Sequence, residues 1–209
     1  MKKISDLLKP FLLVIFGALL FLCYFDLLGS EGAGLAIGIV ALVLAVYFLT
    51  VGLLGTLLGD KFPAKTKALL NACGIGAYPV FMGVYFLLVL ISRASNEWVQ
   101  VGPMGWTLAI FSIGASFALA VFYYVGYFTK QHGFIRGTFL TSALFVLALL
   151  LEILLTNGSP ATLGSIVMLE VVLYGVYTSM LLESLKGFKD ALKAPKAEEA
   201  KPEEEPKAE

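Results

Sequence analysis

The chain has 209 residues, of which 59% are hydrophobic and only 14% are charged. A soluble domain typically has about 45–50% apolar and about 25% charged residues, so the surplus apolar side chains are expected to face lipid. The 15 Lys and Arg residues balance 15 Asp and Glu residues, which argues against a basic protein that binds nucleic acid. Two cysteines are too few for a disulfide scaffold. The composition therefore predicts an integral membrane protein rather than a soluble enzyme.

Six apolar runs are each long enough to cross a bilayer as a helix, which takes about 20 residues. Glycine, proline, asparagine and charged residues separate the runs, as expected of loops. We therefore predict an all-α fold class, a polytopic six-transmembrane-helix bundle over residues 11–185. The predicted spans are Phe11–Leu28, Gly34–Leu58, Leu69–Ile91, Gly105–Phe128, Thr138–Leu155 and Leu163–Leu185. No sequence repeat relates the first three spans to the last three.

The basic residues predict the orientation, because cytoplasmic loops collect lysine and arginine. Of the 15 basic residues, all but Arg93 fall on one side of the predicted bundle. Both termini are therefore expected in the cytoplasm, and the protein is expected to be a multi-pass protein of a bacterial cytoplasmic (inner) membrane.

Polar flanks border the predicted bundle on its basic side. Residues 1–10 form a short cytoplasmic flank. Residues 186–193 are amphipathic, and they either lie in the headgroup layer with their lysines near anionic lipid or simply continue the sixth span. Residues 194–209 are rich in Pro and Glu and have no large apolar side chain, a composition typical of disorder. This tail is either a solubilising segment or a segment that binds a partner.

Small residues follow one face of the second span at alternating steps of four and three. Close approach of backbones through small residues holds helices together in lipid. We therefore expect the second span to be the central helix and to pack against the third and fourth spans. The glycines of this predicted packing face are Gly34, Gly38, Gly52, Gly55 and Gly59.

Pro79 interrupts the third span. A proline inside a helix removes one backbone hydrogen bond, so we expect a kink and a free carbonyl near position 75. Such interrupted helices line substrate sites in transporters, but a purely structural kink is the more common case.

Three carboxylates lie inside apolar spans, all in the outer half of the bundle: Asp26, Glu152 and Glu170. Each costs about 2.5–3.5 kcal/mol on insertion at a helix centre, so each is a hypothesis about function. Arg93 can pair with only one of them. The others must be protonated, hydrated or neutralised by a bound cation.

The neighbours of these carboxylates favour a cation site. Glu170, Tyr174 and Tyr177 share one face of the sixth span, and a carboxylate beside aromatic rings suits a cation. The alternative is that Glu152 and Glu170 are protonated links between helices. Asp26, near the end of its span, is better explained by a position at the membrane surface.

No catalytic constellation is visible in the sequence. His132 is the only histidine, so no metal site, no cofactor and no enzyme activity are expected. Two hypotheses about function follow. The first is a non-enzymatic membrane subunit or scaffold that docks other membrane proteins. The second is a small solute or cation transporter, or a substrate-capture subunit, that uses the outer carboxylates.

Overall fold

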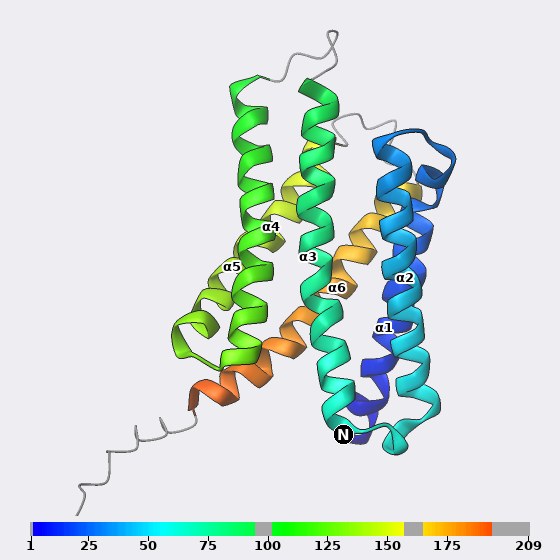
Figure 1. The fold of residues 1–209 in the computed structure, drawn as a ribbon, viewed down its shortest axis with the longest axis vertical. Helices are drawn as coiled ribbons and strands as arrows, with labels where there is room; N and C mark the ends of the chain where they lie inside the picture. The colour runs from blue at the N-terminus through cyan, green and yellow to red at the C-terminus, as the bar shows by residue number, and fades with distance from the viewer. Residues whose placement is uncertain (1, 95–101, 157–164, 194–209) are drawn as a thin grey trace, which may run out of the picture.

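In a computed structural model, which describes residues 2–94, 102–156 and 165–193, the chain forms six long helices (Figure 1). They are α1 (Lys2–Tyr24), α2 (Ala33–Leu57), α3 (Ala64–Ala94), α4 (Pro103–Thr129), α5 (His132–Thr156) and α6 (Ser165–Lys193). Two short 3-10 helices, η1 (Phe25–Gly29) and η2 (Gly59–Lys61), follow α1 and α2. Each of the six described α-helices is long and apolar enough to cross a membrane. This result confirms the predicted all-α, multi-pass architecture.

Local sequence explains several helix ends. Gly32 precedes α2 with a φ of +59°, a left-handed conformation that glycine adopts without strain. Pro103 occupies the first turn of α4, where its missing N–H has no helical partner to lose. Lys130 ends α4 in the left-handed conformation, and its N–H donates to the carbonyl oxygen of Gly126.

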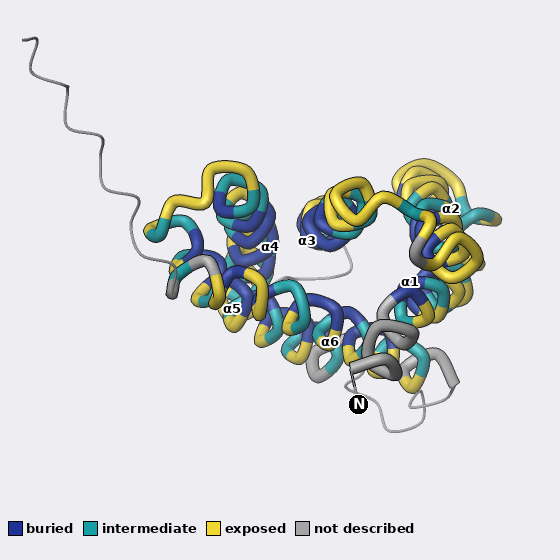
Figure 2. The backbone as a smooth tube through the Cα atoms, turned by 90° about the horizontal axis from the view of Figure 1, so that it is seen from below, coloured by how far each residue is buried: buried dark blue, intermediate teal, exposed yellow. Residues whose placement is uncertain are grey.

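The helices form two layers of three (Figure 2). One layer contains α2, α3 and α4 side by side, and the other contains α1, α6 and α5, with α6 crossing obliquely behind α3. α1 begins and α6 ends at the same end of the bundle, near the connections from α2 to α3 and from α4 to α5. We call this the basic end, because Lys61, Lys65, Lys67, Lys130 and Arg136 lie in or beside those connections.

The helix contacts repeat between the two halves of the chain. α1 packs along α2 as α4 packs along α5, and α3 packs on α4 as α6 packs on α1. If α1, α2 and α3 are matched with α4, α5 and α6, the same pairs of helices are in contact in both halves. The matched helices α1 and α4 nevertheless run in opposite directions (Figure 1). The arrangement is that of an inverted three-plus-three bundle, a relationship that the sequence comparison of the halves did not reveal.

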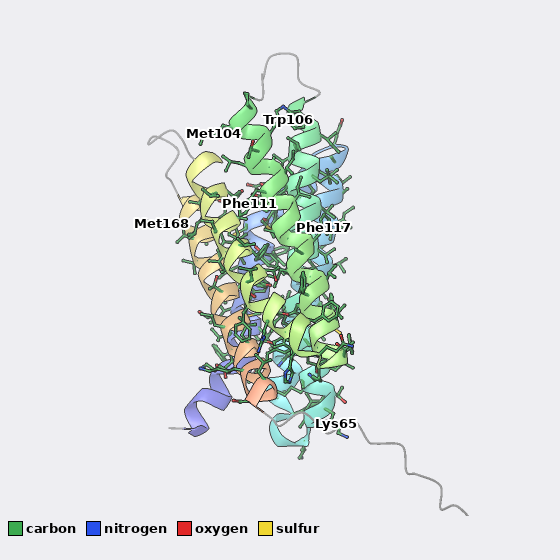
Figure 3. All side chains as sticks on the ribbon, turned by 90° about the vertical axis from the view of Figure 1, so that its left-hand side faces the viewer. Lys65, Met104, Trp106, Phe111, Phe117 and Met168 are labelled. Carbon is green, nitrogen blue, oxygen red and sulfur yellow. The ribbon has the colours of Figure 1, made fainter. Side chains whose placement is uncertain are left out.

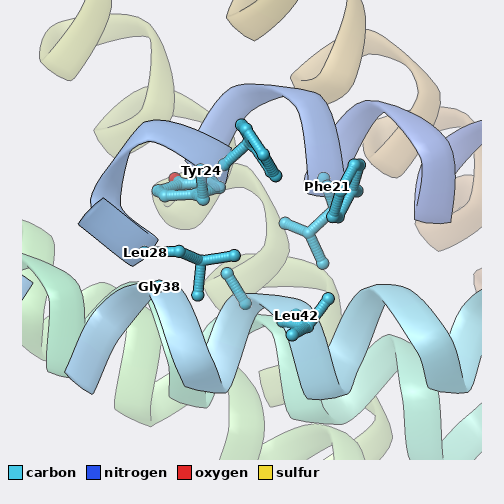
Figure 4. A pocket seen from close by; sticks show the side chains of 8 residues that line it. Phe21, Tyr24, Leu28, Gly38 and Leu42 are labelled. Carbon is cyan, nitrogen blue, oxygen red and sulfur yellow. The ribbon is translucent and has the colours of Figure 1, made fainter. Parts of the chain in front are cut away.

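The glycine face of α2 packs mainly against α1, and α2 lies at the edge of its layer rather than at the centre of the bundle (Figure 2). A Cβ on Gly38 would lie 2.9 Å from the backbone of Leu27 and Leu28, and one on Gly52 would lie 2.9 Å from the backbone of Val14. Side chains of α1, η1 and α2 surround an apolar hollow too small for a water molecule (Figure 4). The prediction that the second span is the central helix is therefore wrong, because α3 and not α2 lies in the middle of this layer, between α2 and α4.

The other glycines of this face lie differently. Gly55 contacts the ring of Pro10, so it belongs to the same contact with α1. Gly34 faces Ser30 in the preceding loop, and Gly59 has open space around it and a φ of +50° where α2 gives way to η2. These two glycines therefore shape the ends of α2 and do not join it to another helix.

The amphipathic segment 186–193 continues α6 without a break. Leu185 and Phe188 are buried within the protein, and Phe188 packs edge-to-face on Tyr123 at 5.5 Å between ring centroids. Phe188, on the apolar face of this segment, therefore packs against α4. Residues 194–209 lie outside the described part of the chain.

Apolar side chains cover the outer surface between the two ends of the bundle (Figure 3). Met104 and Met168 are 74% and 67% exposed near the end opposite to Lys65. A surface of this kind is typical of contact with lipid.

Candidate functional site

The sequence feature that the structure explains most directly is Pro79. It lies inside α3, and because proline has no N–H, the carbonyl of Ile75 one turn earlier has no helical donor. The hydroxyl of Tyr177, on α6, donates to this carbonyl oxygen at 2.9 Å. The predicted free carbonyl is therefore present, and its partner is the tyrosine that the sequence grouped with Glu170.

Five aromatic rings surround this hydrogen bond at mid-height in the bundle. Tyr78 and Tyr177 lie 4.5 Å apart between ring centroids, and Phe16 lies 5.0 Å from Tyr78. All three are fully buried. Phe48 packs on Phe16, and Phe145 packs on Tyr177. We call these five residues the aromatic layer.

Beyond this layer, towards the end opposite to the basic end, Glu152 of α5 is only 9% exposed. The hydroxyl of Tyr174, on α6, donates to Glu152 Oε2 at 2.7 Å. Tyr174 is itself buried. The structure therefore brings together two of the residues that the sequence singled out, on helices that are neighbours in one layer.

Two further tyrosines reach the same region from α1 and α3. Tyr24 and Tyr78 both lie close enough to Glu152 and Glu170 to interact with their charges. The hydroxyl of Tyr78 is buried and has no hydrogen-bond partner in the described part of the chain. We call Tyr24, Glu152, Glu170 and Tyr174 the tyrosine–carboxylate cluster, and Tyr78 of the aromatic layer borders it.

Glu170 occupies the border of this cluster. It is half-buried and lies within electrostatic range of Cys23 on α1. A carboxylate in this position can bind a cation or hold a proton.

The remaining predicted residues lie apart from the cluster. Asp26 is exposed in η1, in agreement with a position at the membrane surface. The side chain of Arg93 falls outside the described residues, so its pairing with a carboxylate stays a prediction. Within the described ranges, no group of three His, Cys, Asp or Glu side chains could hold a metal ion.

A cavity of about 530 Å³ opens at the basic end between α1, α3, α4 and α6. Its inner wall is apolar and includes Leu13, Ile75 and Met180. Polar side chains line the rest, among them Asn71 and Ser184. The hydroxyls of Ser184 and Tyr123 share a hydrogen bond of 2.7 Å.

The cavity ends directly beneath the aromatic layer. Each of the three inner-wall residues lies three positions, or about one helical turn, from an aromatic residue on its own helix. Leu13 precedes Phe16, Ile75 precedes Tyr78, and Met180 follows Tyr177.

One turn further along the same three helices lies an apolar layer, which we define as the fully buried Leu20, Met82 and Leu173. Tyr24 comes next on α1, and its hydroxyl contacts Met82 Sδ at 3.7 Å. On α6, Tyr174 is adjacent to Leu173 and lies at the level of the apolar layer, and Glu170 comes next. The aromatic and apolar layers lie between the cavity and Tyr24, which is about three turns, or roughly 16 Å, from the inner-wall residue Leu13 along α1.

Charged residues gather at the mouth of the cavity. The ammonium group of Lys186 pairs with the Glu183 carboxylate one turn away on α6. Lys130 Nζ lies 4.3 Å above the centroid of the Tyr127 ring. Partial burial lowers the pKa of the Lys130 ammonium group from its usual value, because the charged form loses hydration.

Sequence reasoning missed the cavity and the contributions of Tyr24 and Tyr78. One signal was present, since Asn71 is the one amide side chain in the predicted span Leu69–Ile91, which has no charged residue. The two tyrosines carried no such signal, because an aromatic residue in a membrane span is most simply explained by packing.

Comparison of the chain with protein-family models, with curated proteins and with solved structures finds no match. The functional argument therefore depends on the geometry described above.

Proposed function

We propose that this protein is a small solute carrier that moves a cationic solute between the basic-end cavity and the tyrosine–carboxylate cluster. The observation that carries the proposal is the order of features between α1, α3 and α6. The cavity, the aromatic layer and the apolar layer follow one another along these three helices, and the carboxylates Glu152, on α5, and Glu170, on α6, lie beyond them. A bundle that served only for packing has no need of a cavity on one side of two packed layers and of buried carboxylates on the other.

The pairing of the two halves supports movement across this barrier. In carriers built from inverted repeats, the two halves exchange roles, and access alternates between the two sides of the membrane. Here the equivalent helices α3 and α6 cross at the barrier and make few other contacts with each other. A change in the angle at which α3 and α6 cross would open the aromatic layer. The packing of α1 on α2 and of α4 on α5 would stay intact.

The chemistry of the cluster supports a cationic solute. Glu152 and Glu170 supply negative charge, and the tyrosine rings and hydroxyls can contact a cation through their faces and oxygens. Glu170 is the half-buried member of the pair, so it is the group we assign to first contact with the solute.

Thermal unfolding of the purified protein in detergent tests this assignment. We expect at least one cation from a panel of Na⁺, K⁺, Mn²⁺ and tetraethylammonium to raise the unfolding temperature, because a ligand that binds only the folded state stabilises it. Glu170→Gln should abolish this shift. Asp26→Asn, which removes an exposed carboxylate outside the cluster, should leave it unchanged.

Two results would contradict the proposal. One is a wild-type protein that responds to none of these cations, and the other is a Glu170→Gln variant that responds like the wild type. If the protein then also purified in mild detergent with a stoichiometric membrane partner, the docking hypothesis would replace the carrier.

A further inference from the structure

The basic-end cavity is amphipathic, and its size suits an organic molecule rather than a lone ion. Ligand pockets in proteins typically measure about 300–1,000 Å³, and this cavity measures about 530 Å³. Leu13, Ala72, Ile75 and Met180 form its inner wall, and all four are buried. The body of a matching ligand is therefore apolar.

Asn71 adds a requirement for a hydrogen-bond donor. This residue lines the cavity, and its Oδ1 atom is buried with no hydrogen-bond partner in the described part of the chain. A buried acceptor without a donor is costly in the folded state. A ligand that presents an N–H or O–H group to Asn71 would remove this cost.

The charges of the lining favour a positive ligand. Two carboxylates, Glu183 and Asp190, face one ammonium group, that of Lys186, which pairs with Glu183. Asp190 is exposed at the mouth and is left to interact with the ligand. Among the lining residues the carboxylates therefore outnumber the ammonium groups by one, and Lys130, above the ring of Tyr127, balances the charge of the mouth as a whole.

Tyr127 shows where a second cation is already accommodated. Its ring lines the cavity, and the ammonium group of Lys130 lies over it. Lys130 is an exposed residue, so its side chain can swing into water. An incoming ammonium group can then take its place on the ring, since a tyrosine face attracts either cation.

From these features we infer that the basic-end cavity binds an amphipathic amine, a molecule with an apolar body and a protonated amino group. The inference rests on the proposed function and names the class of solute that the carrier takes up at its basic end. The amino group donates to Asn71 Oδ1, the Asp190 carboxylate attracts its positive charge from the mouth, and the apolar body lies against the inner wall.

Equilibrium binding of radiolabelled tryptamine to the full chain in lipid nanodiscs tests the inference. Indole-3-propionate is the matched competitor, because it carries a carboxylate where tryptamine carries an amine on the same ring and chain length. We expect one saturable tryptamine site per chain. Tryptamine should compete for this site at least about tenfold better than indole-3-propionate, as one charge-assisted hydrogen bond would give.

Three substitutions test how the charges and the amide of the cavity affect tryptamine binding. Asp190→Asn should weaken tryptamine binding about tenfold, and Asn71→Leu should weaken it to a similar degree. Lys130→Gln should strengthen binding, because it removes the competing ammonium group. Asp26→Asn is the matched control for Asp190→Asn, and it should leave binding unchanged.

Folding is checked in the same variants. Asn71→Leu removes the unpaired buried oxygen, so the ligand-free variant should unfold at a temperature no lower than that of the wild type. Loss of binding in a variant of undiminished stability cannot be explained by misfolding.

The inference is overturned if tryptamine binding does not saturate, or if indole-3-propionate binds better. It is also overturned if Asp190→Asn strengthens binding while Lys130→Gln weakens it, a pattern that indicates an anionic ligand. Failure of the carrier proposal would look different. Tryptamine would still saturate the cavity, but Glu170→Gln would leave the cation response intact, and the protein would then be an amine-binding protein without transport.

Discussion

The hydroxyl of Tyr177 donates to the backbone carbonyl of Ile75, the group that Pro79 leaves without a helical donor. This bond joins α6 to α3 at the level of the aromatic layer, where all the surrounding side chains are apolar or aromatic. The proline and the tyrosine therefore form one structural unit, although 98 positions in the sequence separate them.

A double-mutant cycle tests this unit. Tyr177→Phe should lower the free energy of unfolding by about 1–2 kcal/mol, because the buried carbonyl loses its only donor. In a Pro79→Ala background the same substitution should be less costly, since an alanine at this position supplies a helical N–H to the carbonyl of Ile75. The free energies come from unfolding of the purified variants in mixed micelles.

Tyr124→Phe is the matched control for this cycle. Tyr124 donates to the carbonyl of Cys73 at 2.7 Å, and this carbonyl keeps a helical donor because residue 77 is alanine. Tyr124→Phe should therefore lower the free energy of unfolding by the same amount in the wild-type and Pro79→Ala backgrounds. Equal costs of Tyr177→Phe in both backgrounds would show that Tyr177 and Pro79 are independent.

The sequence was sufficient to predict the spans, because the membrane requires long apolar helices whatever their neighbours. It was not sufficient to predict their neighbours. The small residues of α2 indicated a close contact, but glycine has no side chain that distinguishes α1 from α3 as the partner. Chain connectivity decides the matter here, since η1 and a short loop return α2 directly against α1.

The candidate site was predictable only in part. Glu152 and Glu170 were identified because a carboxylate in lipid is costly wherever it lies. The hydrogen bond from Tyr174 to Glu152 needed the structure, since the two residues lie on different helices. The cavity could not be found from the sequence, because it depends on how far α6 diverges from α3 at the basic end.

The glycine contact between α1 and α2 gives a second prediction. A Cβ on Gly52 would lie 2.9 Å from the backbone oxygen of Pro10 and 2.7 Å from a methyl group of Val14. Gly52→Ala should therefore destabilise the protein by about 1–3 kcal/mol through overpacking. Gly175→Ala, where the new methyl group has open space, should change stability by less than about 0.5 kcal/mol. Similar losses in both variants would contradict close packing at Gly52.

The barrier between cavity and cluster gives a third prediction. Cysteine introduced at Ser184, on the cavity wall, should react with a membrane-impermeant maleimide. Cysteine introduced at Leu173, in the apolar layer, should not react, because this side chain is fully buried. Both variants are made after Cys23 and Cys73 are replaced by alanine, and intact mass reports the labelling. Rapid labelling at position 173 in the absence of any ligand would mean that the barrier is open.

The basic end gives the last prediction, which concerns the side of the membrane on which it lies. α1 begins and α6 ends at this end (Figure 1), so both termini should be on one side. Because lysine-rich loops are retained in the cytoplasm, that side should be the cytoplasm.

A fluorescent protein fused to the C-terminus should then fold and emit, whereas alkaline phosphatase at the same position should be inactive. Phosphatase fused into the connection between α3 and α4 serves as the reciprocal control and should be active, since α3 ends and α4 begins at the opposite end of the bundle. An active phosphatase at the C-terminus would reverse the orientation and would place the amine cavity on the outer surface, where a solute would enter from outside the cell.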